Sequence, residues 1–232
     1  MRHAKNLAAA LAVALSIPVA AGASEESGKL TAACEEALAL SALPARLRHQ
    51  ASVYSLTDQG FRKTRENDGP FTCIVERNHV DAIIPQCVDA AGADTIIPGI
   101  MKKTQWTLAG VPLTDRRARF AELAQKEELQ PPPRSGISYM MSNFNYVWNT
   151  NTENLMRVPP HVMFYAPNIS NEDVGGSFQE AVDGNRGTPF VVDVGIHGYM
   201  TSFVERPSES DDVLAACAGQ LPTAEEMVVR KR

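Results

Sequence analysis

Four cysteines constrain the fold of this chain more than any other feature of its sequence. An even number of cysteines in an exported chain indicates disulfides, and four cysteines allow three pairings. We favour Cys73–Cys87, which closes a short loop, and Cys34–Cys217, which ties the first predicted helix to the last. No Cys-x-x-Cys pair occurs, so the cysteine spacing disfavours a redox or metal-thiolate role.

The N-terminus predicts export. It reads MRHAKNLAAALAVALSIPVAAGA, with the basic residues Arg2 and Lys5, an apolar run over 6–20 and then small residues. This pattern is typical of a secretory signal peptide over residues 1–23, cleaved after Ala23. The run is shorter than the about 20 residues of a membrane span. We therefore expect a soluble periplasmic or extracellular protein with no membrane span after cleavage; the alternative is an uncleaved anchor.

The charge balance disfavours one class of partner. The full chain has a formal charge of −5, and cleavage would remove two basic residues and no acidic one. Nothing in such a chain offsets the repulsion of phosphate groups, so we do not expect nucleic acid as a partner.

Hydrophobic periodicity predicts an α+β fold built on an antiparallel sheet. An N-terminal helix is expected over 30–50, with a break at Pro44, and a central helix over 115–129. Three short runs separated by turn residues predict a three-stranded antiparallel meander. The meander covers 51–56, 61–66 and 71–77, and the second-half strands are expected at 137–142, 146–149, 162–166, 190–194 and 199–204.

The segments between these elements carry weaker signals. Residues 94–101 are apolar but contain Pro98, which favours a short helix or an irregular crossing. The Asn/Thr-rich segment 143–154 is expected to be a loop, and 170–173 a capped helical turn. The length predicts one domain over 24–232. The proline run at 131–133 marks a possible subdivision at 130–135.

Histidines beside predicted strands suggest a metal site. His79, His161 and His197 would form an open zinc site, as in a metal-dependent hydrolase or a metal carrier. Asp193 or Glu76 would replace one ligand or orient a ring. A variant of this metal site uses methionine thioethers, which are softer ligands and suit copper. The methionines concerned are Met140, Met141, Met156, Met163 and Met200. The alternative is that these histidines and methionines are structural.

Residue alternation divides the strand over 161–166 into two faces. His161, Met163 and Tyr165 share one face, and they alternate with three apolar residues, Val162, Phe164 and Ala166. We expect the apolar face to be the core face and the histidine face to be amphipathic. Glycines near His197 allow a bulge or a close approach of the backbone.

Aromatic residues concentrate in the second half and suggest a ligand pocket. Binding sites for small organic molecules are mostly apolar, with a few polar groups that fix orientation, and His161 or Asn145 would supply these. The alternative is an aromatic-rich core. The predicted ligand-binding residues are Tyr139, Tyr146, Trp148, His161, Met163 and Tyr165.

Two functions from different classes follow. The chain lacks the G-x-S-x-G, H-E-x-x-H, P-loop and dinucleotide-binding motifs, so the common enzyme signatures give no support. The first hypothesis is a non-catalytic exported domain that binds a small molecule or an envelope protein. The second is the zinc-type hydrolase or metal carrier, and the sequence leaves open which is correct.

Overall fold

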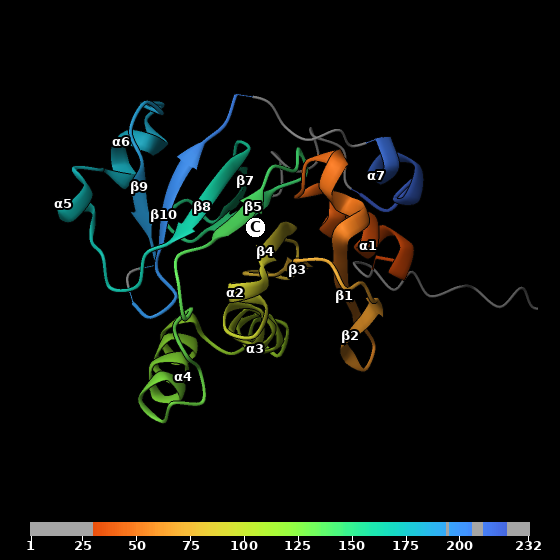
Figure 1. Ribbon diagram of the computed structural model, residues 1–232, viewed down its shortest axis with the longest axis horizontal. Helices are drawn as coiled ribbons and strands as arrows, with labels where there is room; N and C mark the ends of the chain where they lie inside the picture. The colour runs from red at the N-terminus through yellow and green to blue at the C-terminus, as the bar shows by residue number, and fades with distance from the viewer. Residues whose placement is uncertain (1–29, 194, 206–210, 222–232) are drawn as a thin grey trace, which may run out of the picture.

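The computed structural model of the protein describes residues 30–193, 195–205 and 211–221. The predicted signal peptide lies outside the described residues. The described chain forms an eight-stranded sheet with helices on both faces, and a separate two-stranded hairpin (Figure 1). Helices combined with a mainly antiparallel sheet confirm the predicted α+β class.

The order of strands across the sheet is β2-β1-β3-β4-β5-β8-β10-β9. β4 is a strand that the periodicity does not predict. Strands from both sides of the proline run at 131–133 belong to this sheet. Its members are β1 (Ala51–Thr57), β2 (Gly60–Arg65), β3 (Phe71–Glu76), β4 (Ile84–Asp89), β5 (Ile137–Met140), β8 (His161–Tyr165), β9 (Phe190–Val192) and β10 (Tyr199–Phe203).

The predicted meander is wrong in its strand order. β1 pairs antiparallel with β2 and parallel with β3, so β1 lies between the two, whereas a meander has its second strand in the middle. The composition explains the difference. β2 exposes the charged residues Arg62 and Lys63, which suit the edge of a sheet. β3 carries apolar residues on both faces and therefore belongs in the interior, between β1 and β4.

The predicted N-terminal helix is divided in two. α1 (Ala32–Ser41) is followed by the 3-10 helix η1 (Ala45–Gln50), and Pro44 separates them as expected. The Thr31 side chain accepts a hydrogen bond from the backbone N–H of Cys34 and caps α1.

The middle of the chain is more helical than its sequence suggests. α3 (Ile96–Leu108) accommodates Pro98 because that residue lies in the first turn, where backbone N–H groups have no partner within the helix. α4 (Leu113–Gln125) is the predicted central helix. The four short helices are α2 (Ala90–Ala93), α5 (Asn171–Val174), α6 (Phe178–Val182) and α7 (Asp211–Ala216). α5 is the predicted capped turn, closed by a capping box between Ser170 and Asp173.

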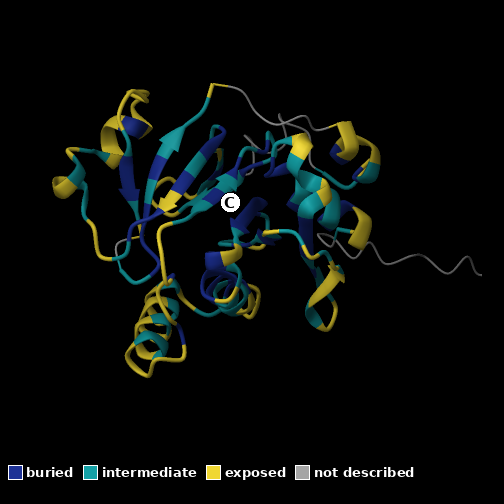
Figure 2. Ribbon diagram, viewed as in Figure 1, coloured by how far each residue is buried: buried dark blue, intermediate teal, exposed yellow. Residues whose placement is uncertain are grey.

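The two faces of the sheet are covered by different helices. On the face that we call the α3 face, strand residues pack with Ile96, Ile97 and Ile100 of α3. On the opposite face, the α1 face, they pack with Leu38 and Leu43. The main strand contacts of α1 are with β1, β3 and β4. Figure 2 shows the buried positions concentrated in the strands and the exposed ones on α4, α6 and the β1–β2 hairpin.

The hairpin of β6 (Tyr146–Asn149) and β7 (Asn154–Arg157) adds to the α3 face. It occupies most of the segment expected as a loop, and the polar residues form its turn. The side chain of Asn78, after β3, fixes the hairpin by accepting from the N–H of Trp148 (3.0 Å) and donating to its carbonyl oxygen (3.0 Å).

Two disulfides stabilise the α1 face, Cys34–Cys217 and Cys73–Cys87, which are the pairs favoured from the sequence. Disulfides form in oxidising compartments, so both are consistent with an exported protein. A buried ion pair between Arg77 and Glu35 also joins β3 to α1. Within the described residues, no helix is long and apolar enough to cross a membrane.

Candidate binding site

The prediction for the two faces of β8 is reversed in the structure. His161, Met163 and Tyr165 are buried, with exposed fractions of 5–6 %, whereas Phe164 is 40 % exposed. The cause lies in the layers that cover the sheet. On the α3 face, Met163 and Tyr165 belong to the core cluster that includes α3 and the β6–β7 hairpin, whereas the main strand contacts of α1 on the opposite face are with β1, β3 and β4.

The centre of the α3 face contains a row of polar side chains with unused hydrogen-bonding groups. In the register of three neighbouring strands, Ser138 on β5 lies opposite Met163 on β8, which lies opposite Thr201 on β10. Both hydroxyl side chains are at most 2 % exposed, and neither has a hydrogen-bond partner among the described residues. A buried hydroxyl left without a partner costs about 1–3 kcal/mol. The fold therefore retains two polar groups that weaken it.

Tyr199 covers this row. Its Cα pairs with that of Tyr165 on β8, but its hydroxyl accepts a hydrogen bond from Nε2 of Gln86 on β4 (3.1 Å). β4 and β10 are separated by β5 and β8, so the phenol ring has to extend across the face above these two strands. Burial raises the pKa of Tyr199 above its usual range, so the hydroxyl stays protonated.

A charged rim borders the covered row. Lys103 of α3 lies with its Nζ 3.4 Å from Oε1 of Glu76, at the end of β3, and 5.8 Å from the ring centre of Phe120. The Lys103 side chain is 32 % exposed and that of Glu76 is 15 % exposed, so this edge of the α3 face meets solvent. Burial lowers the pKa of Lys103, but the carboxylates of Glu76 and Asp193 outweigh that effect and raise it, so the amine stays charged.

His197 completes the rim as a neutral base. Its Nε2 donates to the carbonyl oxygen of Gln130 (2.9 Å), and burial lowers the pKa of its imidazole. A Cβ on Gly99 would lie 3.0 Å from the imidazole ring, so the glycine allows the ring to approach α3. A Cβ on Gly198 would lie 2.8 Å from two carbonyl oxygens, in agreement with the close backbone approach expected here.

The structure brings most of the predicted ligand-binding residues to one face. Met163 and Tyr165 belong to the core of the α3 face, Tyr146 and Trp148 pack against it, and His161 shares the face by register. Tyr139 lies on the α1 face instead, against Phe71. The Tyr165 hydroxyl is already used, because it donates to Oδ1 of Asp89 (2.9 Å) and lies 3.1 Å from the carbonyl oxygen of Ile137.

The three histidines predicted to bind metal have separate surroundings. His79 stacks on Trp148 (4.0 Å between ring centres), its Nδ1 lying 3.6 Å from Oδ2 of Asp81. His161 contacts Phe203, and His197 contacts Phe120. In the part of the chain that the structure describes, no three His, Cys, Asp or Glu side chains are placed to hold a metal ion. The structure thus does not assemble the predicted three-histidine centre.

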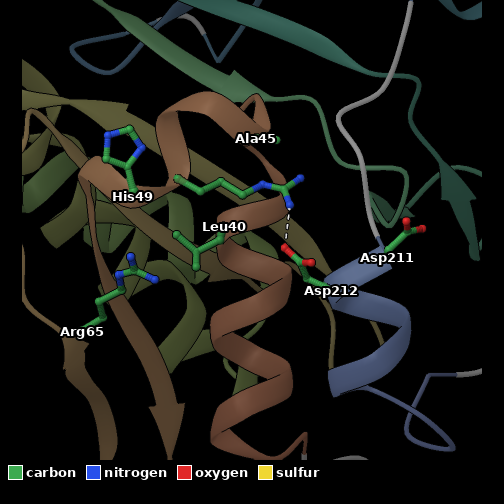
Figure 3. Close-up of a pocket in the computed structure, with 7 residues that line it drawn as sticks. Leu40, Ala45, His49, Arg65, Asp211 and Asp212 are labelled. Atoms are coloured by element: carbon green, nitrogen blue, oxygen red, sulfur yellow. Dashed lines mark hydrogen bonds and ion pairs between the residues drawn. The ribbon is translucent and has the colours of Figure 1, made fainter.

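A surface pocket of about 360 Å³ lies elsewhere, between the end of α1, η1 and α7 (Figure 3). Its two arginines form ion pairs, one within the pocket and one with a neighbour. Nη1 of Arg48 lies 2.9 Å from Oδ2 of Asp212, and Nη1 of Arg65 lies 3.5 Å from Oε1 of Glu36. Both arginines of the pocket are therefore already paired, and we take as the candidate site the α3 face, where two buried hydroxyls have no partner among the described residues.

The residues of this site that the sequence does not reveal are Ser138, Thr201, Tyr199, Gln86 and Lys103. No motif contains them, because they come from four separate elements, β4, α3, β5 and β10. The alternation of Ser138 and Thr201 with apolar neighbours in predicted strands is the signal that was available. Of the residues considered above as additional metal ligands, Glu76 pairs with Lys103, and the carboxylate of Asp193 helps to raise the pKa of Lys103.

Replacing Thr201 by valine is expected to stabilise the protein by about 1 kcal/mol, because the variant removes a buried hydroxyl without a partner and keeps the shape. Urea unfolding measures the change. Thr104→Val is the matched control, because Thr104 is also buried but its Oγ1 accepts a hydrogen bond from the N–H of Arg77 (3.0 Å). That variant should lose stability. Destabilisation by both would show that the Thr201 hydroxyl has a partner.

No family model matches the chain, and neither does any curated protein or any solved structure.

Proposed function

We propose that this protein is an exported, non-catalytic binding protein that holds a small aromatic molecule between the α3 face and α3. The observation that carries the proposal is the pair of buried hydroxyls, Ser138 and Thr201, without partners. Polar groups left unsatisfied in a core lower stability, and a ligand that satisfies them recovers this cost on binding.

The surrounding groups favour one chemical class of ligand. The interior offers neutral hydrogen-bonding groups and aromatic rings, which suit an aromatic ring that carries a hydroxyl. The rim offers two carboxylates, Glu76 and Asp193, against one ammonium, Lys103, and its excess negative charge favours a cation. The ligand is therefore an aromatic molecule with a hydroxyl at one end and an amine at the other.

Entry takes place at the rim, where Lys103 and Glu76 meet solvent. The phenol ring of Tyr199 lies on the α3 face, where its hydroxyl is hydrogen-bonded to Gln86. A ligand that enters there displaces the phenol ring and replaces that hydrogen bond. The predicted residues Tyr146, Trp148 and Met163 contribute apolar surface to the same layer.

Calorimetric titration with tyramine tests the proposal, because tyramine carries a phenol and an amine. Phenethylamine lacks the hydroxyl and 4-methylphenol lacks the amine, so each should bind about tenfold more weakly, as expected for the loss of one hydrogen bond to a polar or charged group. Asp193→Asn should weaken tyramine binding by a similar factor, since asparagine tolerates the positive φ of 57° at this position.

Asp183→Asn is the matched control, because Asp183 is exposed and bonds to Gln179. Thr201→Val should weaken the binding of tyramine but not that of phenethylamine. The proposal is rejected if none of the three compounds binds with a Kd below about 1 mM, or if the Asp193 and Asp183 variants bind tyramine equally.

A further inference from the structure

Beside the hydroxyl row, the α3 face contains one imidazole and two thioethers. Met140 on β5 and His161 on β8 are directly opposite in the antiparallel register, and Met163 follows two residues later on the same face. Side chains directly opposite in such a pair have Cβ atoms about 4.5–5.5 Å apart. All three residues are buried, and both methionines belong to one core cluster.

A backbone hydrogen bond fixes the tautomer of the His161 imidazole. Nδ1 lies 2.8 Å from the carbonyl oxygen of Pro159, which accepts only, so Nδ1 carries the proton. Nε2 is then the unprotonated nitrogen of the neutral ring, and its lone pair can bind a metal ion. A histidine that donates its other N–H to a backbone carbonyl is the usual arrangement at metal sites.

The remaining methionines considered for copper lie elsewhere. Met200 pairs with Phe164, on the face opposite to Met163. Met141 follows Met140 directly and donates its backbone N–H to Ala42 (3.1 Å). The sulfur of Met156 accepts from Nδ2 of Asn149 (3.5 Å). The register therefore selects two thioethers from five.

We propose that Nε2 of His161 and the sulfur atoms of Met140 and Met163 bind one copper(I) ion. Thioether sulfur is a soft ligand that selects Cu(I), and imidazole also suits copper. The set contains no carboxylate, so hard cations such as Mg²⁺ and Ca²⁺ find none of the ligands they prefer. Phe203, whose ring centre lies 6.1 Å from that of His161, contributes the apolar wall that excludes water.

This site goes beyond the proposed function, and its test is separate. The protein, purified without metal, is titrated anaerobically against the chromophoric Cu(I) complex of bicinchoninate in the presence of ascorbate. We expect the protein to withdraw one equivalent of Cu(I). Met140→Leu and Met163→Leu preserve side-chain volume, which keeps the fold, and each should weaken Cu(I) binding by about tenfold or more.

His161→Asn should weaken Cu(I) binding at least as much, because asparagine can keep a donor near Pro159 but lacks Nε2. Met200→Leu and Met141→Leu are matched controls that should leave the affinity unchanged. Thermal unfolding of each variant verifies the fold.

The copper site is excluded if the wild-type protein withdraws no Cu(I), or if Met200→Leu reduces the affinity as much as Met140→Leu. A parallel titration with Zn²⁺ separates this site from a three-histidine centre. Zinc bound at one equivalent and lost in His79→Asn would support that centre and overturn the thioether site. Tyramine binding is measured independently, so either proposal can fail alone.

Discussion

Replacing both Cys34 and Cys217 by alanine is expected to lower the free energy of unfolding by about 2–5 kcal/mol. The disulfide joins residues 183 positions apart, so it restricts the unfolded chain over most of the described length. It also fixes α7 to α1, and both cysteines are buried. Urea unfolding, followed by fluorescence and by circular dichroism to test for a single transition, measures the loss.

The Cys73→Ala/Cys87→Ala double variant is the matched control. That disulfide spans only 14 positions between neighbouring strands, and the entropic account assigns a loop of this size about 3 kcal/mol. We therefore expect the long loop to contribute more than the short one. A loss below about 1 kcal/mol for the Cys34/Cys217 variant would show that the contacts of α7 hold the chain without the bond.

Replacing Arg77 by methionine is expected to lower the free energy of unfolding by about 3–5 kcal/mol, because Glu35 would remain buried as a charge without its partner. Both side chains of the ion pair are almost fully buried, and the second oxygen of Glu35, Oε2, has no hydrogen-bond partner among the described residues. Arg46→Met is the control, since Arg46 is exposed on η1.

The double variant Arg77→Met/Glu35→Leu should recover most of that loss, because well-packed apolar residues often replace a buried ion pair at little cost. A double-mutant cycle by urea unfolding gives the coupling between the two residues. If the double variant were as unstable as Arg77→Met alone, the loss would come from packing of the arginine stem and not from the unpaired carboxylate.

Local sequence patterns predicted the helix breaks and caps that depend on neighbouring residues. Pro44 interrupts the first helix, and the cap around Ser170 and Asp173 forms because both depend on neighbours in sequence. Most of the second-half strands were predicted to within a few residues for the same reason. β7 was missed because its residues, Asn154–Arg157, follow a polar segment and form a strand only by pairing with β6.

How elements that are distant in sequence pair and pack was not predictable from the sequence alone. Alternation correctly divides β8 into two faces, but which face is buried depends on where α1 ends and where the hairpin lies. The position of β1 between β2 and β3 likewise depends on which strands pair in the folded sheet. The row of Ser138, Met163 and Thr201 exists only through the register of three strands, which a single sequence does not specify.

The long disulfide also has a consequence for the order in which the protein matures. If the protein is exported, as we propose, its chain emerges N-terminus first, so Cys217, which lies 183 positions after Cys34, becomes available long after Cys34 does. Cys73 and Cys87 emerge meanwhile, and Cys73 is the first thiol that Cys34 meets. Thiol–disulfide exchange allows such a premature bond to rearrange. The native pairing therefore requires either rapid formation of the β3–β4 bond or a catalyst of disulfide exchange.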